Sequence, residues 1–383
     1  MNTTNRLPIV PVKGKGCFLW DAEGKRYLDF MAGVAVCSLG YGHPRMTYAI
    51  AKQTSRLLHA SNLYHNEPQA RLAERLCHLS FADKVFFCNS GAEANEAAVK
   101  LVRKWGKKNK GESAFEIIAM EGSFHGRTLG MISASGQENL KKGYEPLLPG
   151  FCHVPFGDAS AVATRVGEAT CAVMVEPIQG EGGIRTAPPS YFKALRDLCT
   201  KKRILLIFDE VQTGCGRTGT LFAYEQLGVV PDLMTLAKGL GGGLPIGALL
   251  ARDFAAEAFS PGDHGATFGG NPLVTFVAEA VLETIAKEKI LENVSRTGRL
   301  LKEGLEALKE KFPMIREVRG NGLMLGIELD RPAKPFVARC LEKKLLINSP
   351  QERVLRFLPS LVIGPKQIEE GLEILDHVFK EAA

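Results

Sequence analysis

The sequence has few features of a secreted, membrane-spanning or metal-binding protein. Its nine cysteines are dispersed and include no C-x-x-C pair. This spacing disfavours both a disulfide framework and a zinc site, and it indicates reduced thiols. The first residues, 1–5, lack a basic-then-apolar signal pattern, and no apolar run approaches the length of a membrane span. We therefore expect a cytoplasmic protein with no membrane partner and no bound metal.

The chain also lacks a strong charge of either sign. Its formal net charge is +6 over 383 residues, and the basic residues are scattered. Because no basic stripe interleaved with aromatic residues accompanies the charge, we do not expect a nucleic-acid partner. The composition, 45% hydrophobic and 23% charged, is ordinary for a soluble globular enzyme. A modest attraction for small anionic substrates is all that the charge supports.

Several common catalytic motifs are missing. There is no Walker A sequence, no H-E-x-x-H and no G-x-S-x-G. Residues 214–219 do match G-x-G-x-x-G, the dinucleotide fingerprint. In that fingerprint the first glycine directly follows a strand, whereas here residues 209–213 intervene and the match lies past mid-chain. A nicotinamide-dependent oxidoreductase is therefore only the alternative from a different class.

The order of the predicted elements indicates an α/β protein of two domains. Short apolar runs alternate with helical patterns through the middle of the chain, which predicts a mainly parallel sheet flanked by helices. The predicted strands are 85–88, 115–119, 171–175, 204–208, 233–237 and 246–251, and helices are expected near 45–58, 67–80 and 273–288. We assign residues 46–289 to this large domain.

The order of predicted helices and strands changes in the last hundred residues, which predicts a smaller α/β lobe over residues 290–383. Helices are expected at 290–311, 335–344 and 365–381, with strands at 323–329, 345–348 and 354–358. The N-terminal segment 1–45 contains a predicted hairpin at 16–30. We expect this segment to join the small lobe.

Two polar residues stand where two predicted strands end. Asp209 follows the apolar run 204–208, and Lys238 follows the run 233–237 and precedes a glycine-rich stretch. Ligands bind beyond the carboxyl ends of the strands in open α/β sheets, so this amine and this carboxylate can face one pocket. A lysine that forms a Schiff base and an acid that holds a pyridinium nitrogen are the two fixtures of pyridoxal phosphate chemistry. The presence of both argues against a non-catalytic scaffold.

A third strand end predicts an anion site. The strand 85–88 leads through Asn89 into Ser90, Gly91 and Ala92, at the start of a helix. Exposed amides and the positive end of the helix dipole can bind phosphate there. An ordinary helix cap would explain these residues equally well if they stood alone. Their place in the same sheet as Asp209 and Lys238 favours the phosphate.

Other candidates lie in loops and have plausible structural explanations. Phe124 could cover a flat heterocycle and Arg127 could bind a carboxylate with two hydrogen bonds, although a core Phe and a surface Arg are the simpler interpretation. His125 is expected to support the site from behind, because nothing pairs it with a nucleophile.

Three glutamates and one arginine complete the set of candidate residues. Glu176 and Glu181 lie among glycines at a strand end, which suggests close approach to a bound molecule, although one of them could be a solvated loop carboxylate. Glu210 is expected to be structural. Arg356 stands in the apolar strand 354–358, where a guanidinium needs either an ion-pair partner or a ligand.

Taken together, the motifs resemble those of the class III, fold-type I pyridoxal phosphate aminotransferases, and within them the acetylornithine/succinyldiaminopimelate aminotransferase group. The matching stretches occur in family order and cover nearly the whole chain; they are 87–96, 123–128, 209–213, 237–239, 267–272 and 356–357. The resemblance implies a fold-type I transferase and a homodimer with shared active sites.

The resemblance also implies roles for the cofactor-binding residues. Lys238 would carry the covalent aldimine, and Asp209 would keep the pyridine nitrogen protonated. Phe124 would stack on the ring, while Val211 and Gln212 would contact its other face and its hydroxyl edge. The phosphate would be bound by Ser90, Gly91 and Ala92, joined by Thr267 of the partner subunit.

For the substrates, the resemblance implies a ping-pong transfer of the terminal amino group of N2-acetyl-L-ornithine to 2-oxoglutarate. Arg127 would bind the substrate α-carboxylate, and Glu181 would pair with Arg356 in one half-reaction and release it in the other. Many relatives have serine at the position of Ala266, so a hydroxyl contact is lost here. Succinyldiaminopimelate, ornithine, succinylornithine and 4-aminobutyrate remain alternative amino donors, and an aminomutase remains an alternative activity.

Overall fold

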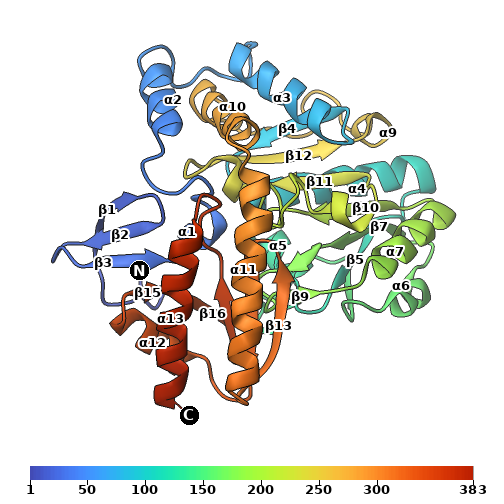
Figure 1. The fold of residues 1–383 in the computed structure, drawn as a ribbon. Coiled ribbons are helices and arrows are strands. Elements are labelled where there is room, and N and C mark those ends of the chain that lie inside the picture. The colour runs from blue at the N-terminus through green and yellow to red at the C-terminus, as the bar shows by residue number, and fades with distance from the viewer. Residues whose placement is uncertain (383) are drawn as a thin grey trace.

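The computed structural model describes residues 1–382, and its largest element is a seven-stranded sheet (Figure 1). The strand order is β4-β12-β11-β10-β7-β5-β6. The bounds are β4 (Lys84–Cys88), β12 (Gly247–Ala251), β11 (Leu233–Leu236), β10 (Leu205–Asp209), β7 (Thr170–Val175), β5 (Glu116–Met120) and β6 (Phe151–Val154). The sheet is mostly parallel, as predicted; β12 alone runs antiparallel to its neighbours β11 and β4.

Both faces of this sheet are buried, which explains the continuous apolar runs of its strands. Successive side chains point to opposite faces of a strand. Leu206 accordingly packs into one apolar cluster, with Val173 of the neighbouring strand, and Ile207 into another, with Met174. Strands covered on both sides lack the polar alternation of a half-exposed sheet.

Helices cover the two faces, and several begin at the cap residues that their sequences contain. Asn66 accepts a hydrogen bond from the Gln69 amide, and Asn271 accepts one from the Val274 amide ahead of Pro272. The helices of this part are α2 (Pro44–Thr54), α3 (Glu67–Leu79), α4 (Gly91–Lys110), α5 (Leu129–Ala134), α6 (Ala159–Arg165), α7 (Pro189–Lys202), α8 (Tyr224–Leu227), α9 (Asp253–Ala256) and α10 (Pro272–Lys287), with 3-10 turns η1 (Glu138–Leu140) and η2 (Lys238–Leu240). A short hairpin, β8 (Ile178–Gln179) with β9 (Arg185–Thr186), follows β7.

The C-terminal part contains a second sheet of four strands in the order β13-β14-β17-β16. Its strands are β13 (Ile315–Asn321), β14 (Met324–Leu329), β17 (Val354–Phe357) and β16 (Asn348–Gln351). Three helices accompany it: α11 (Ile290–Lys311), α12 (Lys334–Glu342) and α13 (Pro365–Ala382). The long helix α11 runs beside β13 in Figure 1.

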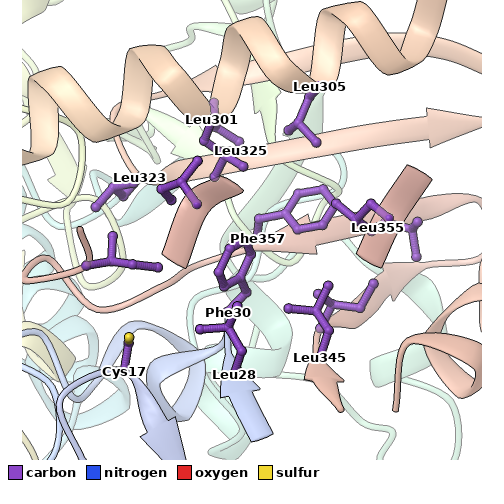
Figure 2. Packing of buried hydrophobic residues seen from close by; sticks show 14 of the residues in the cluster. Cys17, Leu28, Phe30, Leu301, Leu305, Leu323, Leu325, Leu345, Leu355 and Phe357 are labelled. Carbon is purple, nitrogen blue, oxygen red and sulfur yellow. The ribbon is translucent and has the colours of Figure 1, made fainter. Parts of the chain in front are cut away.

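The N-terminal strands belong to this C-terminal part by contact. β1 (Pro11–Lys15), β2 (Phe18–Asp21) and β3 (Arg26–Asp29) form a sheet with β15 (Leu345–Leu346), which pairs parallel with β3. Phe30 meets Phe357 edge to face, with 6.5 Å between ring centroids, below Leu301 and Leu305 of α11 (Figure 2). One apolar core therefore joins segments from the two ends of the chain.

Several strands escaped the sequence analysis, among them the two-residue strands β8 and β9. β1 is exposed and contains proline and glycine, β13 carries four charged or polar side chains, and β6 is a four-residue edge strand. Strands at an edge or with one wet face have weak apolar patterns. The predicted boundary at 289/290 lies at Lys289, between α10 and α11; the division into domains itself stays a prediction. Within residues 1–382, no helix combines the length and the apolar character needed to cross a membrane.

Candidate active site

A cavity of about 500 Å³ opens at the carboxyl ends of β10 and β11. Asp209 and Lys238 both line it, so the amine and the carboxylate share one pocket as predicted. Parallel pairing of the two strands sets this arrangement, with Asp209 opposite Thr235. Lys238 begins a 3-10 turn and has a φ of 40°. A non-glycine residue in this left-handed region is strained, and such strain is concentrated at functional sites.

Asp209 is 3% exposed, and three donors fix its carboxylate. Its Oδ2 accepts hydrogen bonds from Asn95 Nδ2 at 2.8 Å and from His125 Nδ1 at 2.7 Å, while Oδ1 accepts one from the Val211 amide at 3.0 Å. Asn95 is itself held by Thr235 Oγ1 at 2.7 Å. An ionised carboxylate offers about four acceptor sites, so one remains for a ligand N–H. His125 thus supports the site through Asp209, as expected.

The N-terminus of α4, where the sequence analysis predicts an anion site, lies at the cavity. Ser90 is the cap residue: its Oγ accepts a hydrogen bond from the Glu93 amide, and the Glu93 carboxylate accepts one from the Asn89 amide at 2.7 Å. The first helical hydrogen bond joins the Ala94 amide to the Ser90 carbonyl, so the Gly91 and Ala92 amides precede it. Both of these residues line the cavity. The ordinary capping role, which the sequence also allowed, is therefore present together with two backbone amides, those of Gly91 and Ala92, ahead of the first helical hydrogen bond.

The walls of the cavity are built by close backbone approaches. A Cβ atom on Gly91 would lie 2.6 Å from Val211 Cγ1, and one on Gly180 would lie 2.2 Å from Gln212 Oε1. Glycine at 91 allows the start of α4 to come this near to Val211 at the end of β10, whereas a side chain at 180 would have to displace the end of the Gln212 side chain. Val211 and Gln212 are thereby held at the cavity wall, where the sequence analysis placed them.

Phe124 and Arg127 line the cavity on the loop after β5. The Arg127 guanidinium lies 5.6 Å from the centre of the Phe124 ring, and the Phe124 amide donates to Glu176 Oε2 at 3.1 Å. Arg127 is exposed and Phe124 is half-buried. The core-Phe interpretation is wrong for this position, because the ring faces the cavity.

An ion pair connects the cavity to the C-terminal part. Arg356 is 1% exposed, and its NH1 donates to Glu181 Oε1 at 2.5 Å and to Gln212 Oε1 at 3.2 Å. Its Nε donates to Asn348 Oδ1 at 3.1 Å. Burial opposes ionisation of Glu181, but the Arg356 guanidinium outweighs it and holds the pKa of Glu181 below its ordinary value. The guanidinium therefore has a partner that lines the cavity and that a ligand carboxylate could replace.

Comparison with known proteins decides the family. The family model described as aminotransferase class-III matches residues 1–379. The chain belongs to the class III aminotransferases. It is 53% identical over 382 residues to the acetylornithine aminotransferase of Caldanaerobacter subterraneus subsp. tengcongensis, covering 100% of this chain and 97% of the relative.

Solved structures agree with this assignment. The ornithine aminotransferase of Toxoplasma gondii, described with partial occupancy of PLP at its active site, has a TM-score of 0.95 at 35% identity and covers 99% of this chain and 92% of its own. The N-acetylornithine aminotransferase of Stenotrophomonas maltophilia has a TM-score of 0.87 at 39% identity, with 98% and 97% covered. The fold is thus that of the PLP-dependent aminotransferases, as predicted.

Two residues that the resemblance assigns to this class III aminotransferase lie elsewhere. Thr267 and Ala266 line a separate cavity beside the segment 59–73, and Thr267 is exposed. The Ala266 carbonyl accepts a hydrogen bond from Asn62 at 2.9 Å. Neither lines the cavity that contains Lys238. This placement is the one required if Thr267 serves the site of a second subunit.

The misleading glycine motif has a packing role in this aminotransferase. Arg217 is 2% exposed, and its NH1 donates to the Leu323 carbonyl at 3.0 Å and to the Pro359 carbonyl at 2.5 Å. Burial lowers the pKa of Arg217 to about 9. The motif therefore attaches the loop after β10 to the C-terminal part and does not lie at a strand end.

The sequence analysis missed several residues that shape the site. Asn95 and Thr235 hold Asp209 but lie within a helix and a strand, where nothing in a single sequence distinguishes them. Asn348 binds Arg356 from an irregular strand. Glu176 was among the candidates, with a solvated loop carboxylate as the alternative. It is 6% exposed, and burial raises its pKa to about 8, so it is not solvated.

Glu210, expected to be structural, caps a turn and allows a test by pH. It is 1% exposed and accepts hydrogen bonds from the Ala223 and Tyr224 amides at 2.7 and 2.8 Å. Burial raises its pKa to about 7. Because the unfolded carboxyl ionises near pH 4.5 and the folded one only near 7, the unfolded state releases its proton first, and Glu210 reduces stability as the pH rises between these values.

We expect Glu210→Gln to flatten this pH dependence. The difference in unfolding free energy between variant and wild type should change by up to about 3 kcal/mol between pH 4.5 and 7, in favour of the variant. Urea denaturation across this range measures it, with the exposed Glu168→Gln as control. A constant difference at every pH would contradict the assigned burial effect.

Proposed function

We propose that this class III aminotransferase transfers the terminal amino group of N2-acetyl-L-ornithine to 2-oxoglutarate, giving N-acetyl-L-glutamate 5-semialdehyde and L-glutamate, a step of arginine biosynthesis. The observation that carries the choice of donor is the likeness at 53% identity over the whole chain to a protein of that name. Ornithine is the second candidate donor, because an ornithine aminotransferase shares the fold at a TM-score of 0.95, although at only 35% identity.

The residues of the cavity fit pyridoxal phosphate. The cavity combines a lysine amine, a buried carboxylate with one acceptor site to spare, and a helix terminus with amides before its first hydrogen bond. When bound, the cofactor supplies an aldehyde for amines and a ring that withdraws electrons from the reacting carbon. Asp209 would accept the ring N–H, the Gly91 and Ala92 amides would bind the phosphate, and Phe124 would cover one ring face.

Lys238 would hold and move the proton at its Nζ. Burial lowers the pKa of Lys238 below its ordinary value, against the opposing charges of Glu181 and Asp209. A lysine with a lowered pKa is neutral for more of the time and can accept a proton near neutral pH. Asp209 and Lys238 come from adjacent strands, so their separation is fixed by the sheet.

The Glu181–Arg356 pair would distinguish the two substrates. An ω-amino donor has one carboxylate far from its reacting amine, and Arg127 at the cavity mouth suffices for it. The 2-oxoglutarate acceptor has a carboxylate at each end and needs a second cation. Arg356 becomes available when Glu181 moves away, while Gln212 and Asn348 keep the guanidinium in place.

We infer that the protein forms a homodimer and that it is cytoplasmic. Large apolar side chains are exposed near Thr267: Leu58, Leu63, Tyr64 and Phe268. Contiguous exposed apolar residues are typical of an interaction surface. If a second copy covered them, Thr267 would approach the phosphate site of its partner.

The first test is the reaction itself. With pyridoxal phosphate, the purified protein should be yellow and should convert N-acetylornithine and 2-oxoglutarate to glutamate, measured by product chromatography. Lys238→Ala should lose on the order of 10³-fold or more of the activity, because the covalent and proton-transfer group is gone. The exposed Lys201→Ala is the control. A higher kcat/KM with ornithine or 4-aminobutyrate would overturn the proposed donor.

Glu181→Gln tests the exchange of partners. Without the negative charge, Arg356 is free for α-carboxylates in both half-reactions, so discrimination between N-acetylornithine and glutamate as amino donors should fall about tenfold. Initial rates with each donor measure it, and the exposed Glu112→Gln is the control. An equal loss with both donors and with 2-oxoglutarate would contradict the exchange.

Sedimentation velocity tests the shared site. The protein should sediment at about twice its chain mass of 41.6 kDa. Thr267→Val should weaken pyridoxal phosphate binding several-fold because one hydrogen bond to a charged group is lost, whereas the exposed Thr164→Val should not. A monomer that binds the cofactor with full affinity would exclude a contribution from a partner.

A further inference from the structure

A left-handed helical turn directly precedes Val36, a residue of the cavity wall. The element α1 (Ala32–Ala35), marked in Figure 1, has φ values of 46° at Ala32 and 63° at Gly33, Val34 and Ala35. Its hydrogen bonds run from the Ala35 amide to the Met31 carbonyl and from the Val36 amide to the Ala32 carbonyl. Left-handed helical conformation is unfavourable for L-residues because Cβ lies too close to the following carbonyl oxygen, and glycine alone adopts it freely. Three of the four residues are not glycine.

The carboxylate of Asp29 holds the start of this turn. It is 2% exposed; Oδ1 accepts a hydrogen bond from the Met31 amide at 2.8 Å, and Oδ2 accepts one from the Ala32 amide at 3.0 Å. Tyr41 donates its hydroxyl to Oδ2 at 2.7 Å. Burial raises the pKa of Asp29, while the hydrogen bonds from Tyr41, Met31 and Ala32 favour its charged form. These three bonds oppose relaxation of the turn.

The end of the turn and the residues that follow it contact the active site. Val36, the next residue, lines the cavity with Lys238. Ser38 donates its hydroxyl to the carbonyl of Gly239, adjacent to Lys238, at 3.1 Å. Ala35 packs with Ile178 of the segment that leads to Glu181. A right-handed turn would send the chain after residue 35 in another direction, and these contacts would be lost.

We propose that Asp29 is a positioning residue: by binding the two amides at 31 and 32, it maintains the left-handed turn that sets Val36 against the substrate and Ser38 against the lysine loop. This inference rests on the proposed aminotransferase function, though not on which ω-amino donor is preferred. Under this proposal the unfavourable left-handed conformation of residues 32–35 has a function, which is to place Val36 and Ser38.

A second carboxylate in the same strands provides the matched control. Asp21 accepts hydrogen bonds from the Glu23 amide at 3.0 Å, the Lys25 amide at 2.8 Å and the Tyr27 hydroxyl at 2.9 Å. The set of donors is the same as at Asp29, two amides and one tyrosine. Asp21 lies at the tip of the hairpin and does not line the cavity.

The experiment compares Asp29→Asn with Asp21→Asn. Asparagine keeps the shape but loses one acceptor, so the turn should relax in the first variant only. The KM for the amino donor should rise on the order of tenfold, with kcat changed less than about threefold, because a shifted wall misplaces the substrate. Hydrogen–deuterium exchange of residues 31–38, measured without added cofactor, should increase in Asp29→Asn and not in Asp21→Asn.

A second substitution, at Val34, distinguishes the effect of backbone strain from the effect of side-chain packing. Adding Val34→Gly to Asp29→Asn removes the Cβ atom that makes the left-handed conformation unfavourable, whereas Val34→Ala removes the two methyl groups and keeps that Cβ. Glycine should restore KM to within about threefold of wild type, and alanine should not. Equal rescue by both, unchanged exchange at 31–38 in Asp29→Asn, or a uniform exchange increase over the whole chain would overturn the proposal. The exchange result stands even if the amino donor is another compound.

Discussion

The site depends on the parallel pairing of β10 with β11, because this register brings Asp209 level with Thr235. With this pairing, Thr235 donates a hydrogen bond to Asn95, and Asn95 and His125 bind the Asp209 carboxylate. Lys238 follows two residues beyond the end of β11. A carboxylate so deeply buried is stable only with such partners. The backbone of the sheet, more than any loop, determines where the amine and the acid stand.

Much of this could be predicted from sequence because strand ends are visible as breaks in apolar runs. Lys238, Asp209 and the start of α4 all follow such breaks, and the topology of α/β sheets places them together. The residues that support Asp209 are not marked by any comparable break in the sequence. Asn95 is one polar residue in a helix that contains many, and its partner Thr235 sits among apolar neighbours as any buried threonine does. Their roles depend on contacts between distant segments.

Strain was equally invisible in the sequence. Residues 32–35, Ala-Gly-Val-Ala, contain a single glycine, and local propensity does not favour a left-handed turn for them. Tertiary contacts override that propensity, beginning with the Asp29 carboxylate, three residues before the turn. The glycine motif at 214–219 is the opposite case. Its pattern is familiar from dinucleotide-binding proteins, but here it places Arg217 in hydrogen-bonding contact with two backbone carbonyls.

The cap of α4 has a consequence for the size of the anion that it can accept. Glu93 folds back onto the Asn89 amide, so that this donor is already engaged, and the free donors are confined to the two small residues that follow Ser90. If this helix end binds the cofactor phosphate as proposed, the two remaining amides would suit a single tetrahedral group. A second phosphate would then meet the negative charge of the Glu93 carboxylate.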